Sequence, residues 1–175
     1  MSKRELIEFY NWLGFSPRDA ENKVEKFLKS RGKLDVHFSS GKDDWETPDD
    51  VFIPLDREFG FTLDVCANKI NHKVGYYFDE EDNGLIQDWG TNICWMNPPY
   101  SQLKKWLEKA YTSSLNGATV VCLIPARTDT KAWWNFVEGK AEVRRRKGRI
   151  KFVGAKSSAP FPSCIVIYRP GESNV

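Results

Sequence analysis

The sequence predicts an α/β protein whose mostly parallel sheet is covered by helices on both faces. Short apolar runs that suit buried strands alternate with amphipathic segments that suit helices. Aromatic side chains make up 14% of the 175 residues, seven of them Trp, which is too much apolar mass for a disordered chain. No apolar run approaches the roughly 20 residues that span a bilayer, so we expect a cytoplasmic protein without a membrane partner.

Two short helices are predicted at the N-terminus. Apolar side chains recur at helical spacing in the first, which Gly14 should end. Ser16 and Pro17 open the second, as a capping side chain followed by proline in the first turn. The polar stretch that follows contains Gly and Ser and is typical of a linker. We therefore expect a helical appendage over residues 1–40 and the working domain over residues 41–175.

The working domain is predicted to alternate strands with helices. Residues 118–124 are apolar enough for the centre of a parallel sheet, and helices are expected after Ser101 and over residues 130–139. The remaining strand candidates are residues 61–67, 74–78, 92–96, 149–153 and 164–168. About ten residues join the last two, too few for a helical crossover, so the final strand should run antiparallel. The strand candidates at residues 61–67 and 74–78 are also too close in sequence for a helical crossover between parallel strands. Either a helix is missing between them or the second strand lies elsewhere.

Charge is distributed unevenly along the chain. Residues 1–100 carry 12 Lys and Arg against 19 Asp and Glu, whereas residues 101–175 carry 14 against 5. The net charge of +2 therefore hides a basic second half, which indicates a polyanionic partner, the alternative being a solvated surface. The most basic run is Arg144, Arg145, Arg146, Lys147 and Arg149. Because burying unpaired cations is costly, this run should lie at a sheet edge or on a loop and contact phosphates.

Cysteine and histidine are placed unfavourably for metal binding. The four cysteines lie far apart in apolar stretches, where a free thiol behaves as a small buried hydrophobe. Only His37 and His72 could join them. We therefore expect no metal site.

Asn97, Pro98, Pro99 and Tyr100 follow one predicted strand and precede a predicted helix. Ligands of open α/β sheets bind beyond the carboxyl ends of strands, where this tetrapeptide should lie. The Asn97 side-chain oxygen and the Pro98 backbone oxygen could each accept one N–H of an exocyclic amine and so localise its lone pair for methylation. Tyr100 offers a ring on which a flipped base could stack. The alternative is a loop that merely ends a strand.

This tetrapeptide resembles the catalytic motif of amino-methyltransferases that use S-adenosylmethionine. Five more segments follow the order seen in phage and prophage DNA N6-adenine methyltransferases, namely residues 45–48, 63–67, 84–89, 125–129 and 159–163. The chain is similar to that family over about residues 43–169. The resemblance implies a Rossmann-like α/β/α sandwich and direct methyl transfer to adenine N6 in double-stranded DNA.

The resemblance also assigns roles to individual residues. It implies that S-adenosylmethionine is bound by Trp45, Thr47, Pro48, Asp64, Cys66, Ala67, Asp88 and Asn97. Independently of the resemblance, one acidic residue among residues 79–82 could hold the cofactor ribose, because a carboxylate just past the second strand commonly accepts both ribose hydroxyls. The alternative is a solvated turn, which should hold for at least three of the four. DNA would be contacted by the basic run, by Arg127 and by Phe161, although Arg127 could instead pair with Asp129.

Two other functions remain open at this point. The same chemistry could act on RNA or on glutamine in a protein, and a catalytically silent DNA-binding module could have kept the fold. The DNA recognition sequence is not predicted, because the sequence holds no large insertion that could serve as a separate recognition domain. The N-terminal helices are candidates for a homodimer contact or for part of that recognition.

Overall fold

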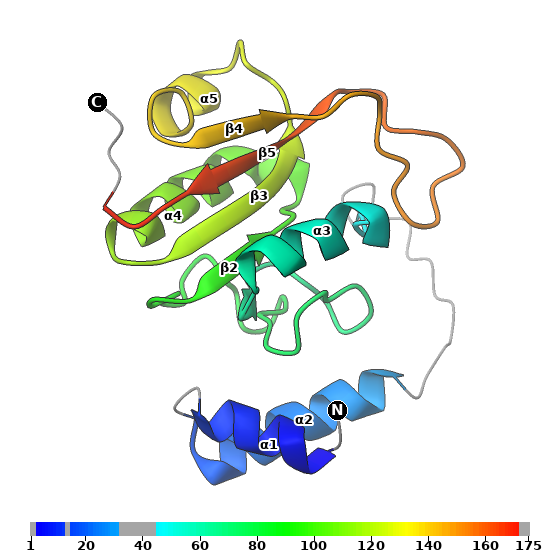
Figure 1. Ribbon diagram of the computed structural model, residues 1–175, viewed down its shortest axis with the longest axis vertical. Helices are drawn as coiled ribbons and strands as arrows, with labels where there is room; N and C mark the ends of the chain where they lie inside the picture. Colours follow the sequence, from blue (N-terminus) through cyan, green and yellow to red (C-terminus); the bar gives the residue numbers. More distant parts are fainter. Residues whose placement is uncertain (1–2, 13–14, 32–44, 172–175) are drawn as a thin grey trace.

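The computed structural model describes residues 3–12, 15–31 and 45–171. Their centre is a five-stranded sheet with the strand order β1-β2-β3-β5-β4 (Figure 1). The strands are β1 (Leu63–Asp64), β2 (Ile93–Met96), β3 (Thr119–Pro125), β4 (Glu142–Arg145) and β5 (Ser163–Tyr168). Strands β1, β2 and β3 are parallel, whereas β5 runs antiparallel to both β3 and β4. A mixed α/β fold with an antiparallel last strand is therefore present.

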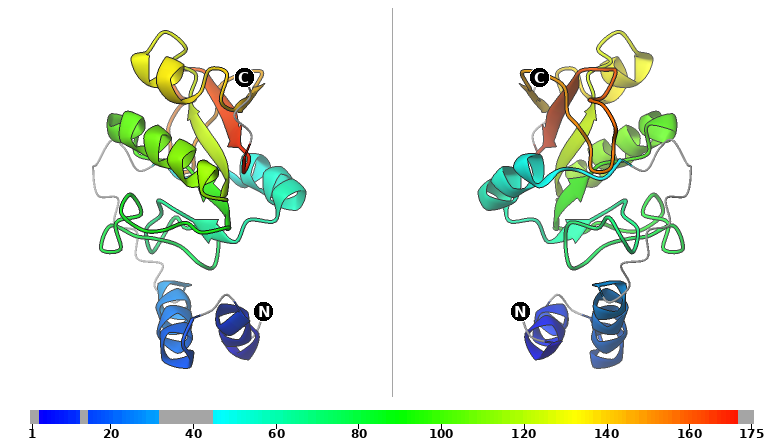
Figure 2. Two further views of the ribbon diagram at one scale, coloured as in Figure 1. Left: turned by 90° about the vertical axis from the view of Figure 1, so that its left-hand side faces the viewer. Right: turned by 90° about the vertical axis from the view of Figure 1, so that its right-hand side faces the viewer.

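Helices cover both faces of this sheet. Helix α4 (Leu103–Leu115) and the short α5 (Lys131–Phe136) lie on one face, and α3 (Asp49–Phe59) lies on the other (Figure 2). Strand β3 is buried on both sides because its alternate residues enter two separate cores. Val120 and Cys122 pack with α4, whereas Val121 and Leu123 pack with α3. A single turn of 3₁₀ helix, η1 (Tyr100–Gln102), joins the end of the Asn97–Tyr100 segment to α4.

The N-terminal helices are α1 (Lys3–Trp12) and α2 (Pro17–Arg31), and they lie at the β1 side of the sheet (Figure 1). Ser16 caps α2 as predicted, since its hydroxyl oxygen accepts the backbone N–H of Asp19 at 3.2 Å. The predicted end of the first helix at Gly14 and the linker after α2 lie outside the described residues.

The strand predicted over residues 149–153 is wrong. The edge strand is β4, a few residues earlier, and Gly148 turns the chain away from it with a φ of +82°. The apolar residues of this stretch are buried without a strand, because Ile150 and Phe152 pack over the α3 face of the sheet and do not join it. A period-2 pattern predicts one buried face but not a strand partner.

The first two predicted strands are shorter than expected. Strand β1 spans two residues, and residues 74–78 make only one isolated parallel bridge, between Tyr77 and Asp64. The backbone of residues 74–78 nevertheless runs beside β1. The Asp64 N–H donates to the backbone oxygen of Tyr76, and the Phe78 N–H donates to the backbone oxygen of Asp64, both at 2.9 Å. The second strand is therefore an edge segment beside β1.

Candidate active site

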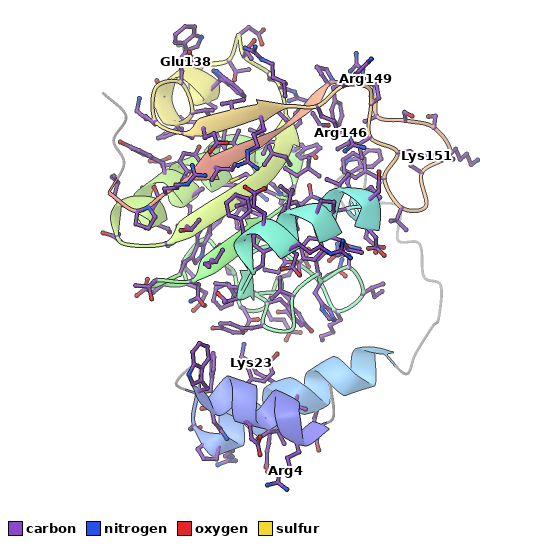
Figure 3. The ribbon with its side chains drawn as sticks, in the orientation of Figure 1. Arg4, Lys23, Glu138, Arg146, Arg149 and Lys151 are labelled. Carbon is purple, nitrogen blue, oxygen red and sulfur yellow. The ribbon has the colours of Figure 1, made fainter. Side chains whose placement is uncertain are left out.

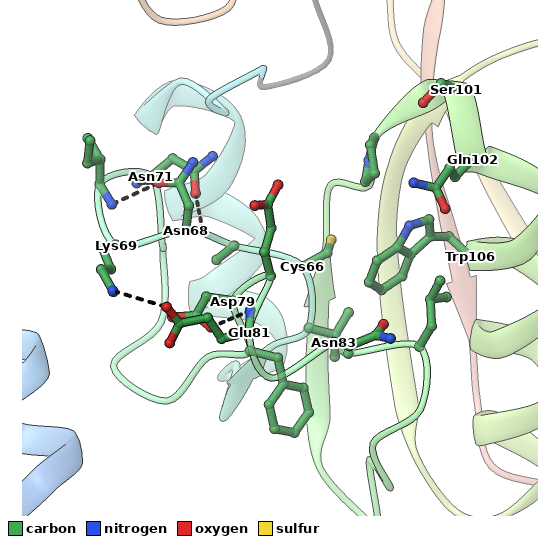
Figure 4. Close-up of a pocket in the computed structure, with 18 residues that line it drawn as sticks. Cys66, Asn68, Lys69, Asn71, Asp79, Glu81, Asn83, Ser101, Gln102 and Trp106 are labelled. Carbon is green, nitrogen blue, oxygen red and sulfur yellow. Dashed lines mark hydrogen bonds and ion pairs between the residues drawn. The ribbon is translucent and has the colours of Figure 1, made fainter. Parts of the chain in front are cut away.

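A cavity of about 840 Å³ opens beyond the carboxyl ends of β1 and β2. One wall is the loop after β1, a second is the segment from Phe78 to Leu85, and a third comes from the start of α4 (Figure 4). In Figure 4, Asn68, Lys69, Asp79 and Glu81 lie across the opening from Ser101, Gln102 and Trp106, and Cys66 and Asn83 lie between the two sides. The cavity thus lies at the sheet edge where ligands of open α/β sheets bind.

A tight acidic turn forms one wall of the cavity. One carboxylate oxygen of Asp79 accepts the backbone N–H groups of Glu81 and Asp82, at 3.1 and 3.2 Å. Asp82 in return accepts the Asp79 N–H at 3.1 Å. These bonds fold the turn so that Glu80 and Glu81 are exposed at the cavity, with Lys69 4.0 Å from Glu81 (Figure 4).

Two further residues shape the cavity, and neither was among the predicted site residues. A Cβ atom on Gly84 would lie 2.1 Å from the backbone oxygen of Val65, so only glycine allows this close approach. Trp106 is buried and lines the cavity, and among the described residues its Nε1–H has no hydrogen-bond partner. Buried donors in proteins normally have partners, so this indole is available to a ligand. Its position in the first turn of the helix that follows the Asn97–Tyr100 segment was the signal that could have identified it.

The Asn97 amide is held in one orientation. Its Nδ2 group donates to the backbone oxygen of Trp45 and, at 3.1 Å, to the hydroxyl of Thr47, which is buried. Both acceptors bind the nitrogen end, so the amide cannot rotate without losing two hydrogen bonds. The oxygen end is left for other donors, one of which is the Tyr100 hydroxyl at 3.3 Å.

Tyr100 is buried and packs edge-to-face on Phe161, with ring centroids 5.5 Å apart. Burial raises the pKa of its hydroxyl well above the usual value, so Tyr100 is a neutral donor at pH 7. The sequence suggested an open ring for base stacking, whereas Phe161 contacts the ring edge-to-face here.

Asp64, at the end of β1, and Cys66, which lines the cavity, are neighbouring titratable groups. Burial raises the pKa of the Asp64 carboxyl to about 7, although the backbone N–H groups of Lys73 and Cys66 donate to it. Burial also raises the pKa of the Cys66 thiol well above its usual value, against a hydrogen bond from the Asn97 backbone. Cys66 is thus a neutral thiol that connects the cavity wall to Asn97.

Apart from Asp64 and Asn97, which do not line the cavity, the predicted cofactor residues fall into three groups. Cys66 and Ala67 line the cavity, as does Pro99 from the catalytic motif. Trp45 and Thr47 bind the Asn97 amide, and Pro48 caps the start of α3, all outside the cavity lining. Asp88 is exposed, accepts the Gly90 N–H at 2.9 Å, and does not line the cavity.

The comparisons with known proteins identify the family of this chain. Residues 37–173 match the family described as DNA N-6-adenine-methyltransferase (Dam). The DNA N-6-adenine-methyltransferase of Haemophilus phage HP1 is 34% identical over 141 residues, which cover 75% of this chain and 81% of the relative. That of Escherichia phage T1 is 33% identical over 95 residues, covering 53% of this chain and 40% of the relative. This chain belongs to the DNA N-6-adenine-methyltransferase (Dam) family.

The match to the Dam family includes the cavity and the Asn97–Tyr100 segment but begins after α1 and α2. In the described part of the chain, no group of His, Cys, Asp and Glu could hold a metal ion. Among the same residues, no helix has the length and apolar character of a membrane span. His37 lies outside the described residues, and the His72 ring stacks on Tyr77.

The basic run lies at the sheet edge, as predicted, on β4 and the loop after it. Its members separate into two sets. Arg144 donates to Glu58 at 2.7 and 2.8 Å and also to Glu142, and Arg146 donates to Asp50 at 3.3 Å. The other set consists of Arg145, Lys147 and Arg149, which are exposed; Arg146 and Arg127 are exposed too. Arg146, Arg149 and Lys151 gather at one corner of the molecule (Figure 3). No ion pair joins Arg127 to Asp129 within the described residues.

Proposed function

We propose that this Dam-family protein methylates adenine N6 in double-stranded DNA, with S-adenosylmethionine bound in the 840 Å³ cavity. Family membership supports the reaction, and the fixed Asn97 amide carries the assignment of the site. The sequence left RNA and protein glutamine open as substrates, and the family favours DNA adenine. The oriented amide favours an active enzyme over a silent binding module.

The residues around the cavity fit this cofactor. The volume lies in the range of small-molecule sites, roughly 300–1,000 Å³. Glu80 and Glu81 present carboxylates that can accept the two ribose hydroxyls, and the unpartnered Trp106 Nε1–H can donate to a heteroatom. Gly84 keeps the floor of the cavity clear of a side chain. When bound, S-adenosylmethionine supplies an electrophilic methyl group on a positively charged sulfur.

Asn97 and Pro98 prepare the target amine. An exocyclic amine of adenine is a poor nucleophile because its lone pair is delocalised into the ring. The Asn97 Oδ1 atom has two lone pairs, and one remains after the Tyr100 hydroxyl has donated to it. With the Pro98 backbone oxygen as the second acceptor, both N–H bonds are held and the nitrogen lone pair is aimed away from the ring plane. Because an amide is not basic, the proton lost from the amine after transfer goes to solvent.

Tyr100 is proposed to receive the flipped base on its ring. Phe161 now contacts this ring, so base capture requires Phe161 to move or to share the contact. Base–aromatic stacking in other proteins is worth about 1–3 kcal/mol per base. The exposed cations Arg145, Lys147, Arg149 and Arg127 are proposed to contact phosphates.

At the level of the whole chain, we propose a Rossmann-like methyltransferase domain over residues 41–175 and a helical appendage over residues 1–40. The strand order, with β5 inserted antiparallel between β3 and β4, supports this assignment. A homodimer contact through α1 and α2 stays a prediction.

An Asn97→Ala variant tests the proposed mechanism. The change removes one of the two amine acceptors and should lower kcat by about 10²-fold or more, while the affinity for S-adenosylhomocysteine stays near the wild-type value. Methyl transfer from labelled S-adenosylmethionine to DNA measures kcat, and calorimetry measures affinity. Near-normal turnover in this variant would contradict the role of Asn97. A wild-type protein that binds S-adenosylhomocysteine but never forms N6-methyladenine would contradict the assigned reaction.

A further inference from the structure

The edge segment of residues 74–78 lies beside β1 at the edge of the sheet and reaches the cavity wall at Phe78. Its hydrogen bonds to the sheet run to β1 and the residues just after it, through Tyr76 and Phe78, with Asp64 and Ala67 as partners. The outer side of a sheet edge has backbone N–H and C=O groups that pair with no further strand, and proteins often cover such an edge with a helix or a loop. The segment leads directly into the acidic turn, so its position sets where Glu80 and Glu81 lie.

Helices α1 and α2 cover this outer side (Figure 2). Tyr10 on α1 is buried, and its hydroxyl donates to the backbone oxygen of Gly75. The Tyr76 ring packs edge-to-face on Phe15 and Tyr10, with centroid distances of 4.8 and 6.1 Å. Val24 on α2 is fully buried in the same small core. The helices thus hold the edge segment from the side that the sheet leaves open.

Lys23 connects α2 to the cavity itself. Its ammonium group lies 4.6 Å from the ring centre of Tyr76, 5.5 Å from that of Phe15 and 5.9 Å from that of Phe78. Figure 3 shows this side chain extending from α2 toward the sheet domain, whereas Arg4 points away from it. Phe78 lines the cavity and contacts Tyr76, with ring centres 5.5 Å apart. A cation over several ring faces is attracted to their negative π-clouds.

We propose that α1 and α2 are a positioning element for the cofactor, in which Tyr10 and Lys23 fix the edge segment so that the acidic turn faces the cavity. This inference rests on the proposed binding of S-adenosylmethionine there. It gives a role to helices that lie outside the family match. Coupling between two sites is reciprocal, so a cofactor that is bound more tightly because the helices are docked must also hold them in place.

Two conservative variants of the full-length chain test the proposal. Lys23→Met keeps the aliphatic stem and removes the charge, and Tyr10→Phe removes only the hydroxyl that binds Gly75. Each should raise the Kd for S-adenosylhomocysteine and the KM for S-adenosylmethionine by about five- to twentyfold, the range of modest coupling between sites. At saturating cofactor, kcat and the KM for DNA should change less than twofold. Lys23→Arg keeps a cation over the rings and should restore most of the affinity.

Arg18→Met is the matched control, because Arg18 is an exposed cation on the same helix. Arg18→Met should leave the Kd for S-adenosylhomocysteine and the KM for S-adenosylmethionine unchanged. Loss of folded protein alone would lower the apparent kcat of a variant and leave the KM for cofactor unchanged, which would count against the proposal.

Hydrogen exchange on the wild-type protein provides a test without substitutions. S-adenosylhomocysteine should slow amide exchange in α1 and α2 as well as in residues 74–82. Wild-type affinity in both variants, or cofactor binding that leaves exchange in the helices unchanged, would overturn the inference and leave the proposed function intact. Failure of the wild-type protein to bind S-adenosylhomocysteine would instead overturn the proposed cofactor site.

Discussion

At the scale of single residues, the most informative contact joins Asn97 to the segment before α3. Thr47 and the Trp45 backbone bind the nitrogen end of the Asn97 amide, which leaves its oxygen for the Tyr100 hydroxyl and for the proposed contact with the amine. The sequence resemblance assigned Trp45 and Thr47 to the cofactor. The structure indicates a second role, in which they orient Asn97, the residue proposed to hold the substrate amine.

Thr47→Val separates these two roles. The change removes a buried hydroxyl with little change in volume and leaves Asn97 with one partner at its nitrogen end. We expect kcat to fall about tenfold, the equivalent of one hydrogen bond, with little change in the Kd for S-adenosylhomocysteine. Thr47→Ser should retain activity, and the same Thr→Val change at the exposed Thr128 is the control. A raised Kd with normal kcat would restore the cofactor assignment.

Asp64 gives the protein a pH-dependent stability. Its pKa rises from 3.8 in the unfolded chain to about 7 in the folded protein, because burial disfavours the charged form. Between these values the folded state retains a proton that the unfolded chain has released. The contribution of Asp64 to the free energy of unfolding is therefore fully present below about pH 4 and is lost as the pH rises through about 7. The free energy of unfolding falls by at most about 1.4 kcal/mol per pH unit in this range.

The measurement is urea unfolding between pH 5 and pH 7.5. Wild-type stability should fall relative to that of Asp64→Asn across this range, because the amide does not titrate. Asp88→Asn, at an exposed carboxyl, should follow the wild type. Parallel pH profiles for wild type and Asp64→Asn would show that Asp64 does not cause the dependence.

At the scale of elements, β4 combines two uses of arginine. Arg144 binds Glu58 of α3 with two hydrogen bonds and also Glu142, which in turn binds Arg169 at 2.6 Å. These bonds lower the pKa of the Glu58 and Glu142 carboxyls and tie the edge strand to the helix beside it. Arg145, on the opposite side of the same strand, is exposed. The alternation of side chains along a strand therefore separates structural cations from available ones.

Two sets of substitutions should separate these cations. Replacing the exposed Arg145, Lys147 and Arg149 by Ala should weaken binding to all DNA sequences and flatten the log–log dependence of affinity on salt by about 0.9 per lost phosphate contact. Replacing Arg144 and Arg146 should lower the melting temperature and leave the salt slope nearly unchanged, because these side chains already have partners. An unchanged salt dependence in the first set would exclude the β4 edge as the DNA-binding surface. Arg127 and Lys156 would then be the next candidates for phosphate contacts.

At the scale of the whole molecule, ligand binding should stabilise the fold. The proposed cavity is built from the loop after β1, the edge segment and the start of α4, so a ligand there links three parts of the chain. S-adenosylhomocysteine at 100 times its Kd should raise the free energy of unfolding by about 2.7 kcal/mol. Thermal unfolding measures this shift, with ATP at equal concentration as the control ligand. No difference between the two ligands would argue against the proposed cofactor.

The sequence alone determined the class of fold, the order of the motifs and the helix that follows Tyr100, because these depend on local periodicity and on short segments. It also placed the basic run at an edge, since five cations in six positions cannot be buried. Tertiary structure decided what those residues contact. The bond from Asn97 to Thr47 spans 50 positions, and Tyr10 reaches Gly75 across 65. Such contacts depend on which strands become neighbours and which face each helix covers, and no local pattern encodes either. The same reason explains the false strand at residues 149–153, where burial over the sheet replaced pairing within it.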